Sequence, residues 1–356
     1  MKTEYLKLEI NEIGEKAQKK IKVFNYGLAL LKVILEFLVV KAHNFNSKST
    51  KNKVILYITK ERSLHVPSFF IMSFYFMYKN IFSLNIKILF KRLIRLLIPY
   101  IIWPIIIWNL NHLWNKKFNT KLADSYEDLI IQLLWGHNYT PQFWFLWNLF
   151  MITIFLTIII FIFRKHSSFI FQLILILFYI AQYSGYDHKI YVKYLDNKKK
   201  TPVLLFASVP YAITGYTLGF YKIIDFILLN KLKSLILSMT IYKFVADYNI
   251  FIDIKDLFYK GIKFNIQSIC IIFIFSFFPS DKIKNKYIVN FLKLITNYTA
   301  GVYYLHYALR YYLNIYFYDI KKGTFLGLFI NYFICYFICF LGMLIFGKTP
   351  FKYLFC

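Results

Sequence analysis

Long runs of apolar residues, each separated from the next by a short polar or basic segment, constrain this chain more than any other feature. The clearest run covers residues 143–163 (FWFLWNLFMITIFLTIIIFIF), contains no charged residue and is followed by Arg164 and Lys165. A helix needs about 20 apolar residues to cross the hydrocarbon core of a bilayer, where backbone groups must be satisfied internally. The sequence therefore predicts an all-α, polytopic membrane protein.

The composition agrees with this fold class. Of the 356 residues, 59% are hydrophobic and only 17% are charged, which is too apolar for an ordinary soluble protein. A net charge of +27 would suggest nucleic acid as a partner for a soluble chain. Here the lysines alternate with apolar runs, so the lipid bilayer with its anionic headgroups is the simpler partner, and no nucleic acid is expected. The four cysteines show no disulfide or metal-ligand spacing.

We expect about ten spans, with one more or fewer possible because two of the runs are short or polar. The runs cover residues 23–45, 65–78, 91–108, 143–163, 168–183, 203–220, 234–251, 264–279, 288–309 and 324–346. Pro99 and Pro104 should bend or locally break the third span, whereas Gly215 and Gly219 should permit close packing of the sixth. The amphipathic residues 125–136 (SYEDLIIQLLWG) should lie along or dip into the membrane interface.

Three segments follow from this count: a cytoplasmic N-terminal tail (1–22), a transmembrane domain (23–346) and a short C-terminal tail (347–356). Residues 1–22 are polar and charged, so no cleavable signal peptide is visible and the first span should act as an uncleaved anchor. Basic residues are nearly balanced between the two sets of loops. The shorter and more densely basic set favours both termini in the cytoplasm, as expected for a multi-pass protein of the cell membrane.

The first span carries three ionisable residues, Lys32, Glu36 and His43. A helix turns about 100° per residue, so Lys32 and His43 share one face, separated by roughly 16 Å along the axis, and Glu36 lies on the same stripe. Charged groups at bilayer depth cost several kcal/mol unless they face a polar interior, and they usually mark a pathway or site. The alternative is that Lys32 and Glu36 only join two helices, with His43 at the lipid headgroups.

A second basic cluster begins the third span, where Arg92 and Arg95 are three residues apart and therefore neighbours on one helix face. Two adjacent guanidinium groups can clamp a phosphate, because each presents a rigid fork of donors. Alternatively, Lys91, Arg92 and Arg95 could be ordinary anchors that reach the headgroups at the end of a span.

These motifs and their order resemble the acyltransferase 3 family of polytopic membrane O-acyltransferases, which typically acylate sugars of cell-surface polysaccharides. Residues 32–43 (KVILEFLVVKAH) are similar to the family's Arg/Lys-x10-His motif, and Arg92-Leu-Ile-Arg95 to its RxxR motif. Three further segments are similar to family motifs: VPSFFIMSFYF (66–76), QFWFLWNL (142–149) and TAGVYYLHYAL (299–309). Phe74 stands where the family usually has glycine, which puts close packing at that point in doubt. Glu36 is not part of the family motif.

The resemblance implies acyl transfer, without a metal, from cytoplasmic acyl-CoA to a hydroxyl on the far side of the membrane. Acetyl-CoA is the default donor, so the expected enzyme is an O-acetyltransferase. His43 would be the general base, because imidazole titrates near physiological pH. Arg92 and Arg95 would hold the phosphates of coenzyme A, and Lys32 would line the path or orient the donor.

Glu36 is our own addition to the catalytic residues beside His43, because it could pair with Lys32 and keep that lysine charged at depth. Three weaker candidates for substrate binding are Trp144, Tyr304 and His306. A late histidine on an aromatic face is at least as often a structural group that has found its partners.

A transporter or flippase for polysaccharide or lipid-linked sugar is the alternative function, since an intramembrane Lys/Glu pair also suits a carrier. We see no internal repeat and no matched broken helices in the sequence, which many carriers have. A sensor or structural membrane protein is the third class. For an acyltransferase, the expected partners are a carbohydrate acceptor and separate polysaccharide-biosynthesis proteins.

Overall fold

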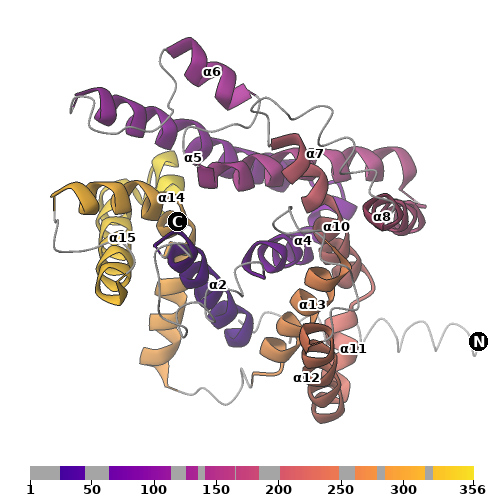
Figure 1. Cartoon of the computed structure of the whole chain (residues 1–356). Helices are drawn as coiled ribbons and strands as arrows, with labels where there is room; N and C mark the ends of the chain where they lie inside the picture. Colours follow the sequence, from indigo (N-terminus) through magenta and orange to yellow (C-terminus); the bar gives the residue numbers. More distant parts are fainter. Residues whose placement is uncertain are drawn as a thin grey trace, which may run out of the picture.

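Helices form the regular structure of this protein, and no strand occurs in the residues that the structure describes (Figure 1). The structure is a computed structural model that describes residues 25–44, 64–113, 126–134, 141–164, 166–183, 201–247, 261–278, 285–316 and 324–356. The all-α class expected from the apolar runs is confirmed for this part of the chain.

In the described residues, a helix lies at the position of each expected span. These helices are α2 (Tyr26–Asn44), α4 (His65–Phe82), α5 (Ile86–Leu113), α7 (Trp144–Phe163), α8 (Ser167–Tyr183), α10 (Thr201–Phe220), α12 (Lys231–Asp247), α13 (Ile262–Ser276), α14 (Lys286–Tyr316) and α15 (Phe325–Phe346). Shorter elements lie between or after them: α6 (Tyr126–Leu134), η1 (Pro141–Phe143), α11 (Ile223–Leu229) and η2 (Pro350–Leu354). The helix α6 falls on the amphipathic stretch noted in the sequence.

Not all of these helices are long and apolar enough to cross a membrane by themselves. Within the described residues, length and composition qualify three helices, α5, α7 and α15, and the pair α10–α11, bent by 57°, would make a fourth. The helices α8 and α13 are apolar but short, and α2 contains Lys32, Glu36 and Lys41. The count of ten spans therefore stays a prediction.

The two prolines of α5 do not break it. Pro99 and Pro104 both lie inside one helix that runs from Ile86 to Leu113, so the helix is not broken at them, and a bend there stays a prediction. A proline removes one backbone hydrogen bond, and neighbouring helices in a membrane protein can offset that loss.

The tight contact expected for the glycines of the sixth span is present between α10 and α4. A Cβ atom added to Gly215 would lie 2.2 Å from the carbonyl oxygen of Ile71, and one added to Gly219 would lie 2.3 Å from the ring of Tyr78. Elsewhere on α4, the side chain of Phe74 is fully buried. A packed ring therefore fills the place where the family usually has glycine.

Figure 1 shows α2 and α4 in the middle of the view, with α14 and α15 on one side and α10 to α13 on the other. The residues that follow α15, expected as a tail, fold back against the helices. Trp103 of α5 donates a hydrogen bond from Nε1 to the carbonyl oxygen of Leu354, at 3.1 Å. The ring of Phe355 lies against Gly342 of α15.

Candidate active site

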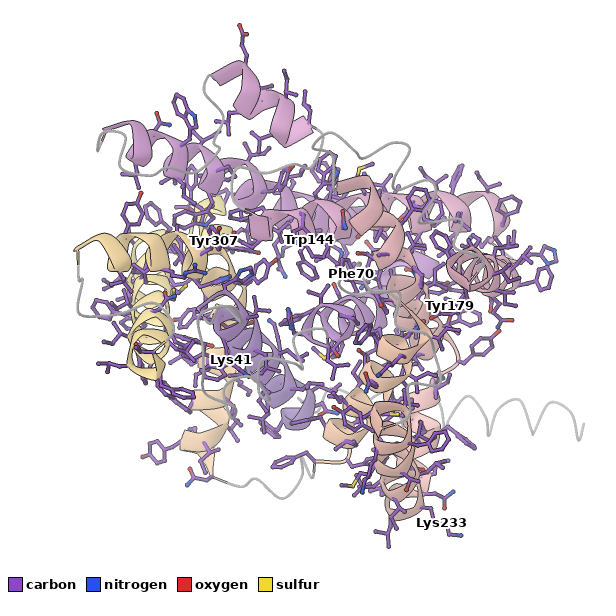
Figure 2. All side chains as sticks on the ribbon, viewed as in Figure 1. Lys41, Phe70, Trp144, Tyr179, Lys233 and Tyr307 are labelled. Atoms are coloured by element: carbon purple, nitrogen blue, oxygen red, sulfur yellow. The ribbon has the colours of Figure 1, made fainter. Side chains whose placement is uncertain are left out.

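The structure brings His43 of α2 together with His306 of α14. Their ring centroids are 5.1 Å apart, and the ring of Tyr307 stands perpendicular to that of His43 at 5.5 Å. His43 is half-buried near the end of its helix, while His306 is completely buried. Figure 2 labels Tyr307 on α14 and Lys41 on α2, the two helices that carry this pair. Two residues predicted separately from the sequence thus lie side by side.

His306 is only partly satisfied by the protein. Its Nδ1 atom lies 3.3 Å from the carbonyl oxygen of Val302, and Asn331 of α15 donates a hydrogen bond to the backbone oxygen of His306. Its buried Nε2 atom has no hydrogen-bond partner among the described residues. Buried polar atoms are usually paired, so the unpaired ring nitrogen beside His43 favours a ligand-binding role over a purely structural one.

His65, at the start of α4, is a third histidine in this region. The structure buries its side chain to 2% exposure. Both His43 and Lys41 interact electrostatically with it. In the part of the chain that the structure describes, no group of His, Cys, Asp or Glu side chains is arranged to hold a metal ion.

Trp144 and Tyr304 are connected through η1, the short turn before α7. The side chain of Gln142 donates to the carbonyl oxygen of Tyr304 at 3.3 Å, and the hydroxyl of Tyr303 donates to the carbonyl oxygen of Gln142 at 2.5 Å. Phe143 stacks on the ring of Tyr304, with centroids 6.0 Å apart. These contacts hold the start of α7, where Figure 2 labels Trp144, against the segment of α14 that carries His306.

Lys32 and Glu36 face different neighbouring helices. The Nζ atom of Lys32 donates to the carbonyl oxygen of Thr296 of α14, at 3.1 Å. Glu36 is fully buried, and its Oε2 atom accepts hydrogen bonds from the hydroxyls of Tyr332 at 2.9 Å and Tyr336 at 3.3 Å. Its Oε1 atom has no partner in the described residues. Lys32 and Glu36 interact electrostatically, but the direct partners of each belong to other helices.

The two tyrosines on α15 were not recognised from the sequence. Tyr332 and Tyr336 are four residues apart, so they share one helix face, and this spacing within an apolar helix was the only available signal. Both hydroxyls reach the same carboxylate oxygen of Glu36, which a sequence pattern on a different helix cannot show.

The contacts between α2 and α14 follow the same order along both helices, from the N-terminal toward the C-terminal end. Lys32 meets Thr296, and His43 meets His306, so α2 and α14 run parallel. Successive spans cross a membrane in alternating directions, so the first and the ninth are expected to be parallel. The shared face of Lys32 and His43 predicted from helix periodicity is confirmed, because both side chains contact α14.

Arg92 is embedded between three helices. Its Nε atom donates to the hydroxyl of Thr153 on α7 at 3.2 Å, and Nη2 donates to the hydroxyl of Ser73 on α4 at 2.8 Å. The guanidinium also lies 5.3 Å from the ring centroid of Phe74. At least two of the hydrogen-bond donors of Arg92 are therefore used within the protein.

Arg95 has different surroundings, although it lies one turn further along α5. Its side chain is exposed and lies 5.4 Å from the ring centroid of Tyr353, and it makes no hydrogen bond to any described residue. Arg95 also interacts electrostatically with Lys32. Burial raises the pKa of the Cys356 thiol, although Arg95, Lys352 and Lys32 act to lower it. These cations thus converge from α2, α5 and η2.

Comparison with known proteins defines the class. A family model described as an acyltransferase domain, that of acyltransferase 3, matches residues 25–348, which is nearly the whole chain. The protein is therefore a membrane acyltransferase. It belongs to the acyltransferase 3 family, as the sequence motifs indicated. No curated protein and no solved structure matches the sequence.

Proposed function

We propose that the protein is an O-acetyltransferase of the cell membrane that uses cytoplasmic acetyl-CoA. The acceptor is a hydroxyl of a cell-surface sugar or polysaccharide on the other side of the membrane. His43 acts as the general base, and Arg95 with Lys32 holds the donor, while Arg92 is fixed to Ser73 and Thr153 beside them. Separate polysaccharide-biosynthesis proteins would supply or use the carbohydrate.

The observation that carries this proposal is the distribution of chemistry along α2 and α14. A histidine pair lies at one end, and cations suited to phosphate lie about 16 Å away, eleven residues back along α2. An acyl-CoA needs both features, because its phosphates are anionic and its reacting carbonyl is at the other end of a long arm. A flippase has no comparable need for a base, and membership of an acyltransferase family argues against it.

In the proposed reaction, His43 accepts the proton of the acceptor hydroxyl as the hydroxyl oxygen attacks the thioester carbonyl. The bond from carbon to that oxygen forms, the carbon–sulfur bond breaks, and the proton passes to the departing CoA thiolate. His306 presents its unpaired Nε2 atom to the acceptor beside His43. Trp144 and Tyr304 line the acceptor side, and Glu36 supports the positive charge of Lys32 through the protein interior.

The test is acetyl transfer from radiolabelled acetyl-CoA in membranes that contain the wild type or His43→Ala. Loss of a general base costs about 10²- to 10⁴-fold in rate, so label should reach the carbohydrate fraction only with the wild type. The matched control is His166→Ala, since His166 is an exposed histidine outside the site. It should transfer label at the wild-type rate.

Protein levels in the membrane are measured for every variant, so that poor insertion is not mistaken for lost chemistry. Transfer that survives in His43→Ala would refute the catalytic assignment. Wild-type membranes that transfer no label, with several acyl-CoA donors tried, would argue against the proposed reaction as a whole.

A further inference from the structure

The segment after α15 lies beyond the family match, which ends at residue 348, yet it packs into the helical body. Tyr353, Leu354 and Phe355 are each less than 9% exposed. The carbonyl oxygen of Leu354 is held by Trp103 of α5, and Phe355 lies against Gly301 and Gly342. This segment is therefore a built part of the fold at the end of the molecule where Arg95 lies.

Tyr353 is the centre of a group of cations. The guanidinium carbon of Arg95 lies 5.4 Å from its ring centroid, and the Nζ atom of Lys352 lies 5.5 Å from the same centroid. Contacts of this kind attract a cation to the ring face and fix its position. The buried Tyr353 ring is thus in contact with one positive charge from each of two elements, α5 and η2.

Neither cation has a carboxylate partner among the residues that the structure describes. Arg95 makes no hydrogen bond there, and Lys352 makes no side-chain hydrogen bond there. Lys32 adds a third positive charge to the same region, since it interacts electrostatically with both Arg95 and Cys356. Like charges in one place repel, so the arrangement favours an anionic ligand that would offset the repulsion.

We propose that Lys352 binds a phosphate group beside Arg95, and that Tyr353 is a positioning residue that holds both cations on that ligand. The inference rests on the proposed function, under which the phosphate belongs to the CoA donor. Phosphate is favoured over a carboxylate ligand because three cations converge, and a phosphate offers more charge and more acceptor oxygens. An anionic lipid headgroup carries the same chemistry and is the competing source.

The experiment measures CoA binding by the purified full chain and the KM for acetyl-CoA in membranes. We expect Lys352→Met to raise both the Kd for CoA and the donor KM about tenfold, with kcat little changed, because it removes one charge-assisted contact. Lys352→Arg should restore wild-type values. The matched control is Lys348→Met, which removes an exposed lysine of the same segment and should change neither constant.

Substitutions of Tyr353, alone and in a background that lacks both cations, distinguish a positioning role of this residue from a role in general stability. Tyr353→Leu should raise the donor KM, whereas Tyr353→Phe should not, because the ring is kept. In an Arg95→Gln/Lys352→Met background, Tyr353→Leu should have no further effect, since the groups that it positions are gone. An equal further rise in the donor KM in that background would show that Tyr353 has a merely structural role, and would overturn its assignment as a positioning residue.

The remaining outcomes are distinct. Wild-type protein that binds CoA, together with Lys352→Met that binds it equally well, would overturn the inference but not the proposed function. If Lys352→Met changes only the dependence of activity on phosphatidylglycerol in vesicles, the phosphate is that of a lipid and the donor assignment is wrong. Wild-type protein that neither binds CoA nor transfers label would overturn both proposals.

Discussion

Arg92 and Arg95 show how far two identical side chains can differ within one helical turn. Arg92 donates to Ser73 and Thr153 and is tied to α4 and α7. Arg95 is exposed, lies 5.4 Å from the ring centroid of Tyr353 and makes no hydrogen bond to the residues that the structure describes. The sequence suggested that the two arginines act alike, as a phosphate clamp or as headgroup anchors, whereas in the structure Arg92 is bonded to neighbouring helices and Arg95 is exposed.

The two arginines should therefore respond differently to substitution. Arg92→Gln should lower the free energy of unfolding by about 1–2 kcal/mol, because two partly buried hydrogen bonds are lost. Arg95→Gln should leave stability unchanged and raise the donor KM. Thermal unfolding in detergent and acetyl-CoA kinetics check the two effects, with Lys91→Gln as an exposed control on the same helix. Equal effects of both arginine variants on stability would contradict this division.

At the residue scale, the sequence located the motif residues but not their partners. Lys32, His43 and Arg95 stand out because charge is rare in apolar runs. The partners of Glu36 could not be found in this way, since Tyr332 and Tyr336 lie on α15, almost 300 residues later. Which helices become neighbours depends on packing across the whole bundle, and a local pattern does not contain that information.

At the scale of elements, glycine lets the helices α4 and α10 approach each other closely. At Gly215 the backbone of α4 comes so near that a methyl group would overlap the carbonyl of Ile71. Small residues at such points let helices approach and gain van der Waals contact in the membrane. The sequence predicted this pairing surface on α10, but it could not predict that α4 is the partner.

Gly215→Ala should destabilise the protein by about 1–3 kcal/mol, the usual cost of overpacking. The contact is with backbone, which cannot rotate away as a side chain can. Chemical unfolding in detergent measures the change. Alanine is a better helix former than glycine by about 1 kcal/mol, so a more stable variant would show that the helices are not in tight contact at this point.

At the scale of the whole molecule, the two ends carry different chemistry. Lys32, Arg95 and η2 gather at one end, while His43, His306 and η1 gather at the other. The helices α5 and α6 meet near the second end, where Ile107 and Trp108 pack against Leu129. The predicted orientation assigns the first end to the cytoplasm.

Cysteine labelling tests this orientation. In a Cys356→Ser background, a membrane-impermeant maleimide should label Glu127→Cys on α6 in intact cells, because that position is exposed and on the outer side. Lys348→Cys should react only after permeabilisation. The other three cysteines are buried, which keeps the background low. Labelling of Lys348→Cys in intact cells would reverse the orientation and with it the direction of acyl transfer.

The parallel pairing of α2 with α14 has a consequence for donor selection. Lys32 and His43 belong to one continuous helix, so the distance between them is fixed by the helical rise and cannot adapt as a loop could. Under the proposed function, the fixed length of α2 sets the distance between the bound phosphates and the histidine pair. The thioester reaches His43 only if the arm of the donor spans that distance. A donor with a shorter arm would bind and not react, so selection would act on arm length before the acyl group itself is tested.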